Sequence, residues 1–378
     1  MTQRFDVCIR GGGIVGSTLA LLLAQQRLRV ALVIQPSPGN PPPGPEGHGD
    51  IRAYALNAAS RHCLESVRGW PTVEHAATPV SRMEVQGDSG GHLSFAAEDM
   101  QRDTLNWIVD VPALESRLAD ALQFQSNVHR MESPPSGAAL TVVCEGRRSG
   151  TRTEFGFDYQ VKPYPHHALA ARVTLNRSHE GVARQWFRNG EIVALLPLGG
   201  AAGQDAALVW SVPWAKAQHL VAAEPAEFLS ELGMVCDMFA DGMTLTHAPK
   251  TWPLELSQAS HWVKTGVALA GDAAHAMHPL AGQGLNMGLA DAAELARVLQ
   301  AREYWRELGD LRLLRRYERV RKADFAAMGG LTDGLFLLFN HRNGMAQKLR
   351  NWGLDGVNKL HPLKNWLTRQ AVGQSGAH

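Results

Sequence analysis

Val267–Leu299 reads VALAGDAAHAMHPLAGQGLNMGLADAAELARVL, and this stretch decides the predicted fold. Its first residues, Val267–Ala270, are apolar and end at Gly271 and Asp272. A short apolar run that stops at a Gly-Asp pair is typical of a buried strand whose tip meets a ligand. The sequence therefore predicts a strand followed by a turn in contact with a ligand.

A loop and then a helix are expected after this turn. Gly282 and Gly284 bracket Gln283, and the helix is predicted to begin at about Leu285. Glycines at such a position let the backbone approach a flat or anionic ligand, with the first free N–H groups of the helix pointing toward it. An ordinary strand-loop-helix connection has the same outline, so this pattern alone leaves both interpretations open.

A second glycine motif lies near the N-terminus. Phe5–Ile9 predicts a short buried strand, and residues 11–16 read GGGIVG before the apolar helix STLALLLAQQ. This is the GxGxxG spacing in the strand-turn-helix context that dinucleotide binding requires. Gly11 is expected to form the tight turn, Gly13 to let a pyrophosphate approach the backbone, and Gly16 to let helix and strand pack closely.

The run from Gly271 onward, GDAAHxxxPxxGQGxNxGxxDA, closely resembles the second FAD motif of the flavin-dependent aromatic hydroxylases. In that family the Asp contacts the ribityl-phosphate side of FAD, and the proline and the GQG loop lie beside the flavin ring. The resemblance extends over nearly the whole chain, from Phe5 to Gly373. It implies that FAD lies extended across one sheet, in contact with Gly11, Gly13, Ile14, Val15, Gly16, Gln35, Arg52, Glu145, Gly271, Asp272, Pro279, Gly282, Gln283, Gly284, Leu285 and Asn286.

The expected fold is mixed α/β (α+β), with a Rossmann-like FAD-binding domain, an antiparallel-sheet substrate domain and C-terminal helices. Alternating apolar runs separated by Gly, Asn and Asp turns between Phe157 and Trp262 predict the antiparallel strands. The FAD-binding domain is predicted to be discontinuous. We assign 1–75, 106–152 and 263–340 to the FAD-binding domain, 76–105 and 153–262 to the substrate sheet, and 341–378 to a C-terminal helical segment.

Several positions depart from the family pattern. Gln35 ends the second strand where an acid normally bonds the adenosine ribose, and an amide makes a weaker bond than a carboxylate. Pro112 stands where relatives place an arginine that reaches the cofactor. Glu145 replaces the aspartate of a DG motif that touches FAD and the pyridine nucleotide, and only Phe124–Ala139 stands where relatives carry a strand meander. Because Gln35 stands in place of the acid, we expect weaker FAD binding than is usual in the family.

Arg52 follows Asp50 by two residues in DIRAYALNAASRHCLE, where the family places an arginine facing the flavin. The N-A-A-S run in this segment resembles the ubiquinone-biosynthesis branch of the family. Without that context, Arg52 would be interpreted as a surface arginine at the start of a helix.

His275, His278 and Pro279 are the candidates for the catalytic pocket. The i, i+3 spacing of the histidines could present two imidazoles to a metal ion, but the sequence offers no third ligand and no metal is expected. A general base that deprotonates a phenol and a structural or pocket-lining role both stay open for the histidines. Pro279 is expected to shape the cavity beside the flavin, and the sequence names no certain base.

The resemblance implies hydroxylation of an aromatic ring of a prenylated phenol in ubiquinone biosynthesis, through a flavin hydroperoxide formed from dioxygen. NAD(P)H is a candidate reductant. Two alternatives stay open. The chain could be a degenerate flavin-binding or flavin-free scaffold of a ubiquinone-biosynthesis complex, or a flavoenzyme of the same fold acting on another aromatic compound or an isoprenoid.

Composition sets the remaining expectations. The 378 residues carry a net charge of +1 and no Lys/Arg block, which gives no reason to expect a nucleic-acid partner. Four widely separated cysteines without CxxC spacing, and the lack of a signal peptide or a membrane-length apolar run, predict a cytoplasmic protein. The tail 341–373 interleaves Trp and Leu with Lys and Arg, which fits either peripheral contact with the inner membrane or a helix packed on its own domain.

Overall fold

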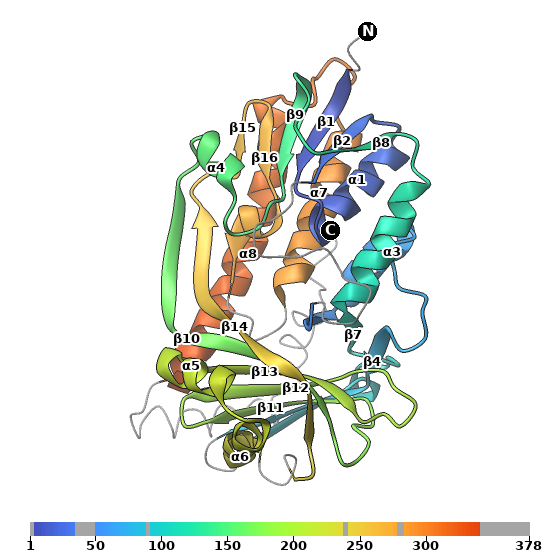
Figure 1. Ribbon diagram of the computed structural model, residues 1–378. Helices are drawn as coiled ribbons and strands as arrows, with labels where there is room; N and C mark the ends of the chain where they lie inside the picture. The colour runs from blue at the N-terminus through green and yellow to red at the C-terminus, as the bar shows by residue number, and fades with distance from the viewer. Residues whose placement is uncertain (1–3, 35–49, 88–90, 237–240, 278–282, 341–378) are drawn as a thin grey trace.

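The computed structural model describes residues 4–34, 50–87, 91–236, 241–277 and 283–340 of the chain, with side chains up to residue 328. Three sheets organise this part of the molecule. One half contains a six-stranded sheet with helices packed on it, and the other half is built on an eight-stranded sheet that crosses below (Figure 1). The expected mixed α/β architecture, with a Rossmann-like parallel sheet and a second antiparallel sheet, is confirmed.

The six-stranded sheet carries the nucleotide-binding outline predicted from the glycine motifs. Its strand order is β15 (Val263–Lys264), β16 (Val267–Leu269), β9 (Ala138–Val143), β1 (Phe5–Arg10), β2 (Val30–Val33) and β8 (Val128–Met131). All neighbours are parallel except β15 and β16. Helix α1 (Ile14–Gln25) connects β1 to β2. The short segment 124–139 contains the edge strand β8.

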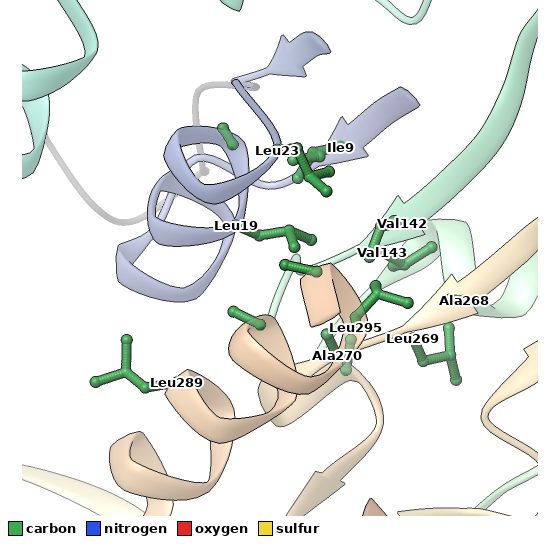
Figure 2. Packing of buried hydrophobic residues seen from close by; sticks show 14 of the residues in the cluster. Ile9, Leu19, Leu23, Val142, Val143, Ala268, Leu269, Ala270, Leu289 and Leu295 are labelled. Atoms are coloured by element: carbon green, nitrogen blue, oxygen red, sulfur yellow. The ribbon is translucent and has the colours of Figure 1, made fainter. Parts of the chain in front are cut away.

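Two helices from distant parts of the sequence pack together beside the central strands. They are α1 and α7 (Gln283–Gln300), which begins two residues before the expected position. Their side chains meet those of β1, β9 and β16 in one buried cluster, labelled in Figure 2 at Ile9, Leu19, Leu23, Val142, Val143, Ala268, Leu269, Ala270, Leu289 and Leu295. Helix α8 (Leu311–Asn340) adds Leu313, Leu314 and Tyr317 to this cluster.

The eight-stranded sheet is antiparallel apart from the parallel pair β11 and β5. Its order is β17 (His275–Ala276), β14 (Thr244–Ala259), β10 (Tyr159–Thr174), β13 (Asp205–Pro213), β12 (Glu191–Pro197), β11 (Val182–Arg188), β5 (Arg82–Gln86) and β6 (His92–Ala96). Leu169, Ala171 and Val173 of β10 share a core with α5 (Trp214–Ala222) and α6 (Pro225–Cys236). Because side chains alternate along a strand, Ala168, Ala170 and Arg172 project from the opposite face.

A three-stranded antiparallel sheet lies between these two parts, in the order β3 (Ala53–Leu56), β7 (Asn106–Asp110), β4 (Ala77–Val80). Its apolar residues pack against Ala183, Leu198 and Ala207 of the larger sheet region. The remaining elements are α2 (Ala58–Ser66), α3 (Val111–Gln123), α4 (Gly150–Glu154) and the short 3₁₀ turns η1 (Glu98–Met100) and η3 (Gly271–Ala273). Within the described ranges, no helix combines the length and apolar character that a bilayer crossing needs.

Candidate cofactor site

The first glycine motif forms the turn between β1 and α1. Gly11 has φ +113°, and a Cβ at this residue would lie 2.5 Å from the carbonyl oxygen of Cys144 on β9's continuation. A Cβ at Gly16 would lie 2.0 Å from the carbonyl oxygen of Gly11, so only glycine lets α1 approach β1 this closely. At Gly13 a Cβ would meet no atom within 4 Å in the part of the chain that the structure describes. In this turn, Gly11 and Gly16 are required by close packing, whereas Gly13 has no close neighbour among the described residues.

The second glycine motif meets the first through Val15. Gly271 has φ +60°, and a Cβ there would lie 3.3 Å from Cγ2 of Val15. Gly288 of α7 has the same neighbour, because a Cβ at Gly288 would come within 2.7 Å of Cγ2 of Val15. At Gly284, in the first turn of α7, a Cβ would again meet no atom of the described residues within 4 Å. The structure thus brings together the two motifs that the sequence places more than 250 residues apart.

These two open positions allow a test of whether the chain fits FAD. The N-cap of α1 is Gly13, which makes no side-chain cap, so N–H groups of the first turn stay available to an anion. The space above Gly13 and Gly284 is where a ligand would touch backbone, while Gly11, Gly16 and Gly288 are required by contacts within the protein itself. Residues Ile14 and Val15 lie in the first turn of α1 between these glycines. The arrangement fits an extended dinucleotide.

Asp272 lies half-exposed beside this turn. Its carboxylate Oδ2 is 3.4 Å from Nε of Arg147, and its carbonyl oxygen accepts a hydrogen bond from the hydroxyl of Tyr159 at 3.2 Å. Arg147 also donates to the carbonyl oxygen of Pro253 at 3.4 Å. Asp272 is thereby linked to β10 and β14 of the eight-stranded sheet while its side chain stays accessible.

Arg52 is paired within its own segment. Its Nε donates to Oδ1 of Asp50 at 2.8 Å, and Nη1 donates to the hydroxyl of Tyr54 at 3.3 Å. Burial raises the pKa of Asp50, but the hydrogen bonds and charge of Arg52 outweigh burial and lower it overall. Burial lowers the pKa of Arg52, yet Asp50 raises it above its ordinary value. The ion pair is therefore fully charged near neutral pH.

Arg172 of β10 holds this segment in place, which the sequence did not reveal. It donates from Nε to the carbonyl oxygen of Ile51 at 2.7 Å and from Nη2 to that of Arg52 at 3.1 Å, and it pairs with Asp110. The face of the eight-stranded sheet that carries Arg172 therefore faces the segment that contains Ile51 and Arg52. Ser211 lies on the same face, opposite Ala168, and its buried hydroxyl has no hydrogen-bond partner in the described part of the chain.

Glu145, the residue in place of the family aspartate, is held by hydroxyl groups of this chain. Its Oε2 accepts a hydrogen bond from Oγ of Ser149 at 2.7 Å, and its Oε1 accepts from Oγ1 of Thr151 at 2.7 Å. Nε of Arg10, at the end of β1, lies 3.4 Å from Oε1. Burial raises the pKa of Glu145, but the hydrogen bonds from Thr151 and Ser149 outweigh it and lower the pKa. The extra methylene lets this carboxylate reach the start of α4.

His275 is buried at 2% exposure, and its Nε2 lies 2.7 Å from Oδ2 of Asp291 on α7. The imidazole is stacked on Trp262 with ring centroids 4.6 Å apart, and the ring of Phe325 lies on it at 4.9 Å. Of the two roles left open for this histidine, the geometry favours the structural one. His278, Pro279, Gly282 and Gln35 lie outside the described residues.

Asn286 uses its amide to join α7 to the β3–α2 connection. Its Oδ1 accepts from the N–H of Asn57 at 3.0 Å and from Oγ of Ser60 at 2.7 Å, and its Nδ2 donates to the carbonyl oxygen of Ala55 at 2.8 Å. Asn57 and Ser60 are the ends of the N-A-A-S run, so that run has a structural role. Gln283 and Leu285 lie in the same first turn of α7.

No three His, Cys, Asp or Glu side chains in the described ranges are grouped in a way that could hold a metal ion.

Comparison with known proteins agrees with this geometry. Residues 114–328, more than half of the chain, match the family model described as FAD binding domain. Ubiquinone hydroxylase UbiL of Rhodospirillum rubrum is 30% identical over 97% of this chain and 89% of its own length. The 3-demethoxyubiquinol 3-hydroxylase of Escherichia coli is 29% identical over 98% of this chain and 99% of its own.

Among solved structures, Pseudomonas aeruginosa PqsL in complex with 2-aminobenzoylacetate superposes with a TM-score of 0.76 at 22% identity, over 91% of this chain and 99% of that chain. This likeness concerns the fold. With the family match, the full-length relatives and the two glycine turns in contact, the chain belongs to the FAD-dependent aromatic hydroxylase (monooxygenase) family.

Proposed function

We propose that this chain hydroxylates an aromatic ring of a prenylated phenol in ubiquinone biosynthesis, with FAD as cofactor and NAD(P)H as reductant. The observation that carries the proposal is the full-length similarity to a ubiquinone hydroxylase and a demethoxyubiquinol hydroxylase. The N-A-A-S run that anchors Asn286 adds support, because it resembles the same branch. Bound FAD would supply the activation of dioxygen.

The residues of the chain have three tasks in this reaction. The turn at Gly11–Gly16 and the first turn of α1 bind the pyrophosphate, because open space and free N–H groups meet there. The N-terminal turn of α7 would place its partial positive charge beside bound flavin, where it would favour negative charge on the ring. The face of the eight-stranded sheet that carries Arg172 and Ser211 covers the site, orients the phenol and excludes water.

A scaffold without chemistry is the alternative that one observation favours. Glu145 is bound to Ser149, Thr151 and Arg10, so its carboxylate is engaged by the protein itself. Contact of the tail 341–373 with the inner membrane, and membership of a ubiquinone-biosynthesis complex, also stay proposals. The tail lies outside the described residues.

The test combines flavin content with turnover. Flavin released by heat from purified protein is quantified against protein, and NAD(P)H oxidation is followed with a prenylated phenol and, separately, with the same phenol lacking the prenyl chain. We expect about one FAD per chain and a hydroxylated product from the prenylated compound. Protein that takes up no added FAD would support the scaffold. Equal turnover without the prenyl chain would support a soluble aromatic substrate.

A further inference from the structure

A buried ion network lies directly behind the Gly271–Asp272 turn. Asp291 of α7 has no exposed surface, and both of its carboxylate oxygens are in use. Oδ2 accepts from the backbone N–H of Gly271 at 2.9 Å and lies 2.7 Å from Nε2 of His275. Oδ1 accepts from Nε of Arg321 at 2.7 Å. One carboxylate therefore joins the turn, the histidine and α8.

Arg321 is itself fixed on α8. It is 4% exposed, its Nη1 donates to Oδ2 of Asp324 at 2.5 Å, and its Nη2 donates to the carbonyl oxygen of Met287 at 3.3 Å. The planar guanidinium thus contacts α7 at two places, at the Asp291 carboxylate and at the main chain one turn earlier. The planar guanidinium supplies a positive charge and also fixes the directions of its hydrogen bonds, whereas a lysine ammonium group supplies the charge without that fixed geometry.

His275 anchors the other end of the turn. Its ring lies between Trp262 and Phe325, and its backbone belongs to β17, in which His275 pairs with Gln258 of β14. The segment from Gly271 to His275 is therefore held at both ends by the same Asp291 oxygen. This geometry leaves the turn little freedom to change its distance from Val15 and α1.

The charge state follows from the surroundings. Burial raises the pKa of Asp291, but the charges and hydrogen bonds of His275 and Arg321 outweigh burial and lower it. An ionised carboxylate can only accept, so His275 donates from Nε2 in this arrangement. A buried charge that loses one donor is strongly disfavoured, which makes the network behave as a unit.

We propose that Arg321 and Asp291 are positioning residues for FAD. Through the Gly271 N–H and the His275 imidazole, they fix the turn that carries Asp272 against the cofactor. Asp291 is the last aspartate of the run that resembles the second FAD motif, but the resemblance implies no cofactor contact for it or for Arg321, which lies 49 positions beyond Asp272 in sequence. The proposal rests on the placement of FAD at the two glycine motifs.

The test measures FAD affinity and reduction potential in addition to stability. Asp291→Asn keeps the size but turns one acceptor oxygen into a donor, which faces either Arg321 or the Gly271–His275 pair. We expect this variant to raise the FAD Kd about tenfold or more, as for the loss of a charged hydrogen bond. Arg321→Lys keeps the charge and loses the fork, so we expect a rise of about threefold. The reduction potential of the bound flavin should shift in both variants.

Lys216→Met is the matched control. Lys216 on α5 bonds Glu191 at 2.8 Å and Glu231 at 3.0 Å, so its loss also breaks a partly buried ion cluster, but on the outer face of the eight-stranded sheet. It should lower the unfolding temperature and leave the FAD Kd and the potential unchanged.

The possible results distinguish the placement of FAD from the positioning role of Asp291 and Arg321. Wild-type protein that binds no FAD overturns the cofactor placement and this proposal with it. Wild-type protein that binds FAD, together with variants of unchanged Kd and potential, overturns the positioning role alone. If Asp291→Asn does not fold, Arg321→Lys decides the matter in the same way, because its milder change leaves the charge balance intact.

Discussion

Replacing Gly13 by alanine should separate cofactor binding from the stability of the fold. Gly13 has φ −71°, a conformation open to any residue, and an added Cβ meets no atom of the described chain within 4 Å. Alanine is a poorer N-cap than glycine by about 0.5–1 kcal/mol. The lower entropy of the unfolded chain offsets this by about 0.4–1 kcal/mol. We therefore expect the unfolding temperature to change by less than about 2 °C.

Gly16→Ala in the same motif is the contrasting variant. A Cβ there lies 2.0 Å from the carbonyl oxygen of Gly11, which is backbone and cannot rotate away. Overpacking costs about 1–3 kcal/mol where side chains adjust, and a backbone contact puts the cost at the upper end of that range or above it. We expect the unfolding temperature of this variant to fall by roughly 5 °C or more.

The assay pairs thermal unfolding of the apoproteins with titration by FAD, followed by quenching of flavin fluorescence. If the pyrophosphate lies against Gly13, the added methyl group overlaps it and costs about 1–3 kcal/mol, which is roughly a 5- to 150-fold rise in Kd. Gly13→Ala should thus be as stable as the wild type and bind FAD poorly. Wild-type affinity in Gly13→Ala would refute the assignment of this space to the cofactor.

Three further variants test the surroundings of the site. Glu145→Gln should cost about 1–2 kcal/mol at neutral pH, since the amide cannot accept both hydroxyl bonds at full strength. Because the folded-state pKa of Glu145 is lowered, its contribution is present above the ordinary glutamate pKa and is lost as the pH falls through the lowered value, so urea unfolding in acid should show no difference from the wild type. Ser211→Ala removes a buried hydroxyl without a partner in the described chain, so the unfolding temperature should hold or rise, while the KM for the aromatic substrate should rise if that hydroxyl meets it. Arg172→Met leaves Asp110 and two carbonyl oxygens without their donor, and calorimetry should show a loss of about 2–3 kcal/mol; an unchanged stability would mean that these bonds are replaced by water.

Sequence reasoning located the elements whose signals are local. The β1 strand, the GGGIVG turn and α1 follow one another within about twenty residues, and each has its own pattern of apolar residues or glycines. The alternating runs that predict antiparallel strands lie between His166 and Pro213, and β14 is not among them because Pro249 and Pro253 interrupt its alternation. Proline disfavours a central strand, yet β14 pairs with the long β10 and shifts register near both prolines.

The contacts within the site could be predicted only in part. Gly11, Gly13 and Gly16 have the geometry that their spacing indicates, since that spacing is a property of one turn. The partner of His275 is Asp291, sixteen residues away on another element, and Arg321 is further still. The available signal was an aspartate on the apolar stripe of a predicted helix, where a charge must find a buried partner. The pairing of Glu145 with Arg10 needed the knowledge that β1 and β9 are neighbours.

The segment Gly271–Ala276 bears on how this protein can be engineered. Within six residues the chain leaves the six-stranded sheet, forms the turn at the cofactor site and becomes the last strand of the eight-stranded sheet. The substrate sheet therefore cannot be exchanged for that of a relative by cutting the chain in surface loops, because one of its ends is the turn at the cofactor site. A chimaera that changes substrate range would have to keep His275 with Asp291 and graft β14 so that Gln258 still pairs with His275. Libraries confined to those residues of β12 and β13 that share the face of Arg172 and Ser211 leave this junction intact and vary only the covering face.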